Sequence, residues 1–152
     1  MSVLTKNQEW EQVFDVVART VDGMGRPIDR GIIGVVLGLN AHRIRTRMSC
    51  EGHLDHGLLY PWIWVPAEDQ GKLAEVLNAF NHAHEEAGEQ AMDHMLIILC
   101  NFIEDMCVLQ NFGAACQNER EPQLKAKKLK EYQTEMQAFA EFLKERFFED
   151  GR

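Results

Sequence analysis

Helix-like and strand-like segments follow one another along this chain in an order that restricts the fold to a few architectures. In four stretches, apolar side chains recur every three or four residues, which is the spacing of an amphipathic helix. These stretches are 5–22, 27–42, 67–87 and 122–148. Four shorter runs with strand character lie at 43–50, 59–65, 95–100 and 106–110. Because the strands come in pairs joined by short loops, we expect a small, mostly antiparallel sheet packed by helices, which is the α+β class.

The last predicted helix has the most regular pattern. Its apolar residues follow one another at steps of three and four, and they are Leu129, Tyr132, Met136, Phe139 and Leu143, extended by Phe147. One interpretation is that this long C-terminal helix covers the sheet with a single face. The other is that part of the face, with Phe142 and Phe148 beside it, packs against a second subunit, so that the protein is a homodimer.

Length and charge limit the classes of protein that this chain can belong to. A chain of 152 residues can build its own core, and we expect a single domain over 1–152. The formal net charge of −8 disfavours general nucleic-acid binding and binding to anionic membranes, because no overall positive field attracts either partner. The N-terminus lacks the basic and apolar regions of a signal peptide, and no window approaches the roughly 18 apolar residues of a transmembrane helix, so neither is expected.

The spacing of the cysteines indicates a reducing environment. The four residues are Cys50, Cys100, Cys107 and Cys116. They form no C-x-x-C pair and no dense framework of the kind found in small secreted proteins. We therefore expect reduced thiols and a cytoplasmic location.

No other stretch is as rich in reactive groups as residues 49–57, between two strand-like runs. They read Ser49-Cys50-Glu51-Gly52-His53-Leu54-Asp55-His56-Gly57. The two glycines allow tight turns, and a loop held by a rigid scaffold is where proteins often bind or react. Three roles are open for this loop: metal binding, acid–base or nucleophilic chemistry, and ligand binding without chemistry.

Each role would use different residues of the loop. Metal binding would use Cys50, His53, Asp55 and His56, whose side chains are ligands of zinc or a related divalent metal. Catalysis would use Cys50 as a nucleophile activated by His53 or His56, or it would use Glu51 or a histidine as a general acid or base. Cys50, however, falls on the predicted core face, which favours an inert thiol. In the third role, Ser49 and Asp55 hydrogen-bond the turns and the loop is shaped for binding alone.

Strand alternation predicts a ligand-binding face beside this loop. In 43–50, one face is formed by Arg43, Arg45, Arg47 and Ser49, and the other by Ile44, Thr46, Met48 and Cys50. In 59–65, Tyr60, Trp62 and Trp64 lie on the face opposite to Ile63 and Val65. If Ile44 and Met48 face the core with Ile63, the arginines lie alongside the aromatic rings. Guanidinium groups then bind phosphate or carboxylate while the rings stack on a base. Alternatively, the arginines are solvated and the rings belong to the core.

These patterns predict a binding module for a small anionic, nucleotide-like ligand, in the manner of a ligand-sequestering protein. In this interpretation Arg45 and Arg47 contact the charge and Trp62 or Trp64 stacks. The loop orients the ligand through Ser49, Glu51, Gly52, His53 and His56. The alternative is a metal-dependent hydrolase or transferase that uses Cys50, His53, Asp55 and His56.

A longer pattern surrounds the loop. It consists of Leu39-Asn40, Thr46, Ser49 to Gly57 and Tyr60-Pro61-Trp62, and it continues at 111–115 and 132–139. This pattern resembles a family of small uncharacterised bacterial proteins, covers most of the chain and implies no particular activity. A shorter stretch, Ser49 to His53, is similar to the Ser-Cys-Ser-Gly-Arg segment of wybutosine-tRNA methyltransferases. That resemblance implies methyl-donor and tRNA binding, although here histidine replaces the arginine and the chain is acidic.

Overall fold

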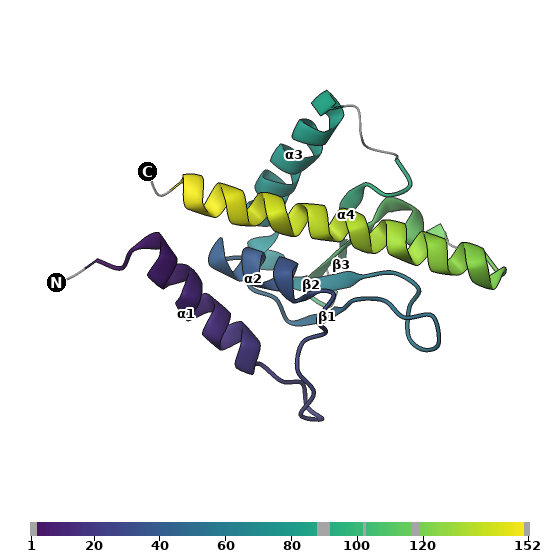
Figure 1. The fold of residues 1–152 in the computed structure, drawn as a ribbon, viewed down its shortest axis with the longest axis horizontal. Helices are drawn as coiled ribbons and strands as arrows, with labels where there is room; N and C mark the ends of the chain where they lie inside the picture. The colour runs from purple at the N-terminus through teal and green to yellow at the C-terminus, as the bar shows by residue number, and fades with distance from the viewer. Residues whose placement is uncertain (1–2, 88–91, 102, 117–118, 151–152) are drawn as a thin grey trace.

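The computed structural model describes residues 3–87, 92–101, 103–116 and 119–150. Its helices are α1 (Lys6–Arg19), α2 (Ile33–Ala41), α3 (Gln70–Ala87) and α4 (Pro122–Glu149), with the short 3-10 turns η1 (Ala67–Asp69) and η2 (Phe112–Cys116). Its strands are β1 (Met48–Cys50), β2 (Trp62–Pro66), β3 (Leu96–Asn101) and β4 (Met106–Asn111). The α+β class and the long C-terminal helix are therefore confirmed (Figure 1).

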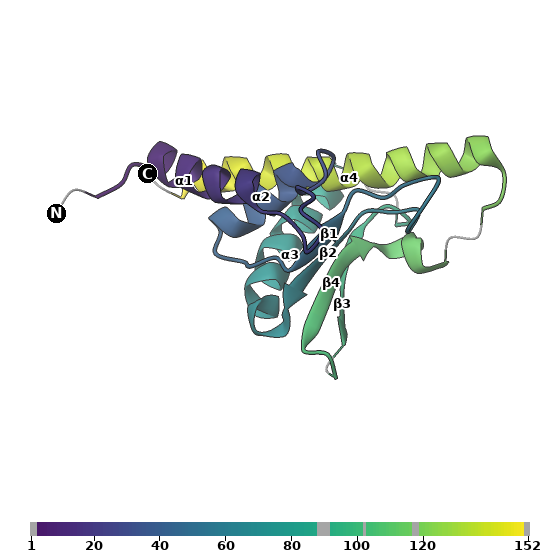
Figure 2. The same cartoon turned by 90° about the horizontal axis from the view of Figure 1, so that it is seen from below.

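The strands form one antiparallel sheet. Their order is β1-β2-β4-β3, so that β1 and β3 are its two edges. The predicted hairpin is formed by β3 and β4, which pair from Leu96 opposite Asn111 to Asn101 opposite Met106. Helices α1, α2 and α4 lie in a layer along one side of the sheet, and the β3–β4 hairpin extends away from this layer (Figure 2).

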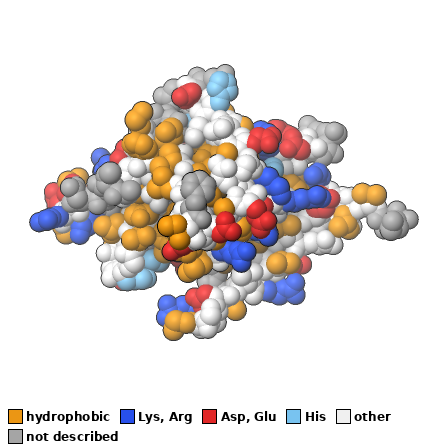
Figure 3. Space-filling view, turned by 180° about the vertical axis from the view of Figure 1, so that it is seen from behind, with side chains coloured by type: hydrophobic (Ala, Val, Ile, Leu, Met, Phe, Trp, Pro, Cys, Tyr) orange, Lys and Arg blue, Asp and Glu red, His pale blue; other side chains and the backbone are white. Residues whose placement is uncertain are grey.

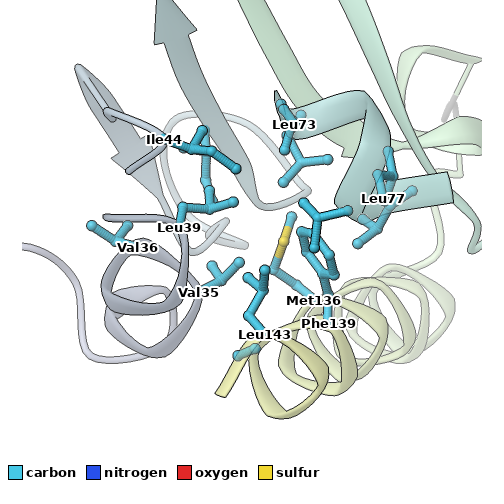
Figure 4. Packing of buried hydrophobic residues seen from close by; sticks show 14 of the residues in the cluster. Val35, Val36, Leu39, Ile44, Leu73, Leu77, Met136, Phe139 and Leu143 are labelled. Atoms are coloured by element: carbon cyan, nitrogen blue, oxygen red, sulfur yellow. The ribbon is translucent and has the colours of Figure 1, made fainter. Parts of the chain in front are cut away.

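The core lies between the sheet and the helices. The apolar stripe of α4 is buried in it, and its buried residues are Leu129, Tyr132, Met136, Phe139, Leu143 and Phe147. Side chains from α2, α3 and α4 point toward one another there, as Figure 4 shows for Leu39, Leu73 and Leu143. This burial confirms that α4 covers the sheet with a single face. The stripe is consequently not free to pack against a second subunit.

A glycine sets the distance between α2 and α4. A Cβ atom added at Gly38 would lie 2.8 Å from the Cβ of Leu143, which is closer than two such carbons approach. One turn earlier, a Cβ atom at Gly34 would lie 3.5 Å from the Cβ of Ala140, in ordinary contact. Gly38 therefore allows the close approach of the two helices, whereas Gly34 does not limit it.

The strand predicted over 43–50 begins only at Met48. The preceding residues end α2 instead: Arg43 adopts a φ of 63°, and the N–H of Ile44 donates to the Leu39 carbonyl at 2.9 Å. This is the usual left-handed helix ending, with an arginine in the place where glycine is common. Because the ending uses the backbone of 43 and 44, those residues cannot extend the sheet.

The thiols do not all behave as expected. Cys100 and Cys107 lie opposite each other on β3 and β4 and are joined by a disulfide, so the prediction of reduced thiols is wrong for this pair. Cys50 is a free thiol, and the side chain of Cys116 lies outside the described part of the chain. The cytoplasmic location stays a prediction. Among the described helices, none is long and apolar enough to cross a membrane.

Candidate functional site

The reactive loop joins β1 to β2, and glycine geometry shapes it. Gly52 has a φ of 85°, and a Cβ atom there would lie 2.8 Å from the carbonyl carbon of Tyr60 and 2.7 Å from Leu129 Cδ1. Only glycine fits without strain or displacement of its neighbours. One residue later, the N–H of His53 donates to the Leu58 carbonyl at 2.9 Å and closes the loop.

The loop brings two of its predicted metal ligands together with a carboxylate from a distant segment. One ligand atom each from Asp29, Cys50 and His53 lies within 4.8 Å of the other two. His53 Nε2 is 3.5 Å from Asp29 Oδ2, and all three side chains are half-buried. Asp29 precedes α2 and stands 21 residues before Cys50, so spacing along the chain does not reveal it. This cluster is called the Asp29–Cys50–His53 triad below.

Backbone and side-chain hydrogen bonds hold the triad in place. The N–H of Glu51 donates to Asp29 Oδ2 at 3.2 Å, and Glu51 Oε2 accepts from the N–H of Gly31 at 2.6 Å. Helix α4 fastens both segments, because Gln133 Nε2 donates to the Glu51 carbonyl at 2.9 Å and Gln137 Nε2 donates to the Gly31 carbonyl at 2.7 Å. The two segments that supply the triad, around Asp29 and around Cys50, are therefore hydrogen-bonded to each other and to α4.

The surroundings of Cys50 favour a neutral thiol. Burial raises its pKa, and the negative charges of Asp29 and Glu51 raise it further. The N–H of Gly52, 3.4 Å from the sulfur, acts in the opposite direction but does not compensate. A thiol whose pKa is raised is a weak nucleophile near neutral pH. The geometry therefore gives no support to Cys50 as an activated nucleophile.

The other two predicted metal ligands form a separate, exposed pair. His56 Nδ1 lies 2.7 Å from Asp55 Oδ1, and this hydrogen bond is the main reason why the pKa of Asp55 is lowered. The ring of His56 stacks on that of His53 with centroids 4.1 Å apart. Of the four loop residues expected to bind metal, Cys50 and His53 thus lie together. The third member of their cluster is Asp29, and Asp55 and His56 lie outside it.

The predicted face of arginines and aromatic rings does not form. The register sets Met48 opposite Trp64 and Cys50 opposite Trp62, whereas Ser49 lies opposite the buried Ile63. The predicted alternation is thus wrong by one residue, and Met48 is exposed instead of buried. The length of the connecting loop decides the register, and a shift by one residue reverses the two faces of a strand.

The arginines have acidic neighbours instead. Arg45 Nε lies 2.9 Å from Asp69 Oδ2, and its guanidinium also pairs with Glu68. Arg47 lines a depression of about 620 Å³ together with Glu68, Glu104 and Asp105. The rings of Trp62 and Trp64 are half-buried, and their centroids are 5.8 Å apart. Acidic neighbours weaken the attraction of these arginines for an anion.

A polar cleft lies beside the triad. Its volume is about 370 Å³, and it is lined by Gly31, Glu51, Lys130, Gln133, Thr134 and Gln137. Gly31 and Glu51 are close in sequence to Asp29 and Cys50, so this cleft and the triad share the same two segments. No protein-family model, curated protein or solved structure matches the chain.

Proposed function

We propose that this protein binds a divalent transition metal, with zinc as the best chemical match, through Asp29, Cys50 and His53. The observation that supports this proposal is the convergence of a thiol, an imidazole and a carboxylate within 4.8 Å. In a tetrahedral zinc site, neighbouring ligand atoms are roughly 3.3–3.6 Å apart. The separation of 3.5 Å between His53 Nε2 and Asp29 Oδ2 already matches this range.

The number of ligands favours a site that reacts or binds over a purely structural one. Structural zinc sites are closed by four protein ligands, whereas catalytic sites have three and leave a position for water or substrate. Here the described residues supply three. A bound zinc ion would supply Lewis-acid chemistry, and the protein would act as a metal-dependent hydrolase or transferase. The N–H groups of Gly52 and Glu51 donate to Cys50 Sγ and Asp29 Oδ2, which helps to hold these two side chains in place.

A second candidate function is a binding module for a small anionic, nucleotide-like ligand. The cleft of about 370 Å³ favours it, because that volume is in the range of small-molecule sites. In this case Lys130 supplies the positive charge, and the amides of Gln133 and Gln137 lie along the wall. Lys130 takes the place of Arg45 and Arg47, which have acidic neighbours. The Glu51 carboxylate also lines this cleft, and it accepts a hydrogen bond from the Gly31 N–H. A homodimer fits either candidate only through a surface other than the buried stripe of α4.

Native mass spectrometry after addition of zinc tests the first candidate. We expect one zinc ion per chain, lost in Asp29→Asn and in His53→Ala. His56→Ala is the matched control, because His56 stacks on His53 but lies outside the triad, and it should keep the metal. Circular dichroism would show that each variant is folded.

Two results would contradict the proposed ligand set. One is an absence of bound zinc in the folded native chain. The other is the reverse pattern, in which His56→Ala loses the metal and Asp29→Asn retains it. If the same spectra show a nucleotide-sized mass bound without metal, and Lys130→Ala removes that mass, the second candidate replaces the first.

A further inference from the structure

Strand β3 is an open edge of the sheet with an unusual sequence for such a position. It reads Leu-Ile-Ile-Leu-Cys-Asn over Leu96–Asn101 and pairs with β4 on one side. Natural edge strands are commonly protected from further pairing by lysine, by proline or by a bulge. This strand contains no charged residue and no proline, and its pairing with β4 is regular from end to end.

The hydrogen-bond pattern shows which backbone groups of β3 point away from β4. The N–H of Phe112 donates to the Met95 carbonyl at 2.7 Å, which makes these two residues a hydrogen-bonded pair. Because such pairs alternate in an antiparallel ladder, the N–H and C=O groups of Leu96, Ile98 and Cys100 point outward. The carbonyl of Leu96 accepts from Asn81 Nδ2 at 3.3 Å. For Ile98 and Cys100, the described residues provide no partner for the outward backbone groups.

We propose that β3 pairs with β3 of a second copy of this chain, antiparallel, around a two-fold axis at Leu99. In this register, Ile98 lies opposite Cys100 of the partner subunit, and the same contact repeats on the other side of the axis. Each such pair exchanges both of its N–H···O bonds. All outward backbone groups of Ile98 and Cys100 then have partners, and the bond from Asn81 to Leu96 is undisturbed. The surface is therefore complementary to itself, which a two-fold dimer requires.

The side chains on the outer face of the sheet support the same pairing. Leu99 lies opposite Val108 on that face and is 46% exposed, although it is apolar. Ile97 lies beside it, half-buried. Figure 3 shows the side of the molecule opposite to α4, where apolar side chains lie at the surface among polar and charged ones. At the proposed axis, Leu99 would pack against Leu99 of the partner subunit, so the apolar surface would continue from one copy to the other.

A cysteine at the axis gives a sharp test. Residues at the axis form a non-hydrogen-bonded pair, with Cα atoms about 4.5 Å apart. Cys100 and Cys107 occupy such a pair within the chain and are disulfide-bonded, so this geometry suits a cross-strand disulfide. We expect Leu99→Cys to form a covalent dimer under mild oxidation, visible on a non-reducing gel. Ile97→Cys is the matched control, since it shares strand and face but lies away from the axis, and it should remain monomeric on the gel.

Sedimentation of the full chain provides an independent measurement. The native protein should be dimeric at high micromolar concentration, and Leu99→Lys should raise the dissociation constant at least about tenfold, because it brings two like charges to one axis. A native monomer without crosslinking of Leu99→Cys would overturn the proposal, and so would equal crosslinking by Ile97→Cys. His53→Ala should still form the dimer, which separates this result from the test of the metal site.

Discussion

Two faces of α4 hold the rest of the chain by different means. On one face, Met136, Phe139 and Leu143 are buried against α2 and α3. On the other, Gln133 and Gln137 donate hydrogen bonds to the Glu51 and Gly31 carbonyls beside the triad. Burial of apolar surface has no preferred direction and contributes most of the stability, whereas a hydrogen bond contributes little but fixes an orientation. The first face should therefore determine whether the chain folds, and the second should determine the geometry of the site.

Leu143→Ala should have the largest effect on stability. Leu143 has no exposed surface, and its loss would leave a cavity between α4 and α2. Substitutions of this kind cost about 2–5 kcal/mol. Chemical denaturation followed by circular dichroism measures the free energy of unfolding. Lys144→Ala is a suitable neighbour for comparison because this side chain is exposed, and a similar loss in both variants would refute the distinction between the two faces.

Gly38→Ala should have an intermediate effect, and Gly34→Ala should have the opposite one. The added methyl group at Gly38 would meet Leu143, and overpacking costs about 1–3 kcal/mol. At Gly34 the same methyl group has room, and the higher helix propensity of alanine should stabilise the protein by up to about 1 kcal/mol. Thermal denaturation of the two variants side by side measures the difference. Equal changes at both positions would show that Gly38 does not limit the approach of the helices.

Gln133→Ala should change stability least and the site most. The lost hydrogen bond to the Glu51 carbonyl is worth about 1 kcal/mol. The affinity for zinc should nevertheless fall by about tenfold, as it does when groups that orient metal ligands are removed. Competition with a zinc-binding dye measures this affinity. Gln123→Ala, at an exposed position in the first turn of α4, should leave it unchanged. An unaltered affinity in Gln133→Ala would mean that the tether does not position the triad.

Local patterns account for the elements that the sequence predicted well. The stripe of α4 and the hairpin of β3 and β4 depend on the spacing of neighbours along the chain, which is visible without any tertiary contact. The predicted hairpin, with strands at 95–100 and 106–110, sets Cys100 opposite Met106, whereas the observed register sets it opposite Cys107, so the disulfide depends on a register that the spacing did not give.

The errors share a different origin. The register of β1 depends on the length of the whole loop from Glu51 to Pro61, and a change of one residue exchanges the two faces. The left-handed conformation of Arg43 and the hydrogen bond from Ile44 to Leu39 kept these residues out of the strand predicted over 43–50. Both features depend on how separate segments fit together, and periodicity within one segment carries no information about that.

The sequence alone determined the α+β class, the long C-terminal helix and the loop that supplies Cys50 and His53. These follow from local spacing and from the chemistry of single residues. Only the tertiary structure brought Asp29 beside that loop, paired Arg45 with Asp69, and left β3 as an uncharged edge. The physical reason is that ligand geometry and ion pairing depend on distances in space between segments far apart in the chain. Those distances depend on how the helices and the sheet pack together in the core.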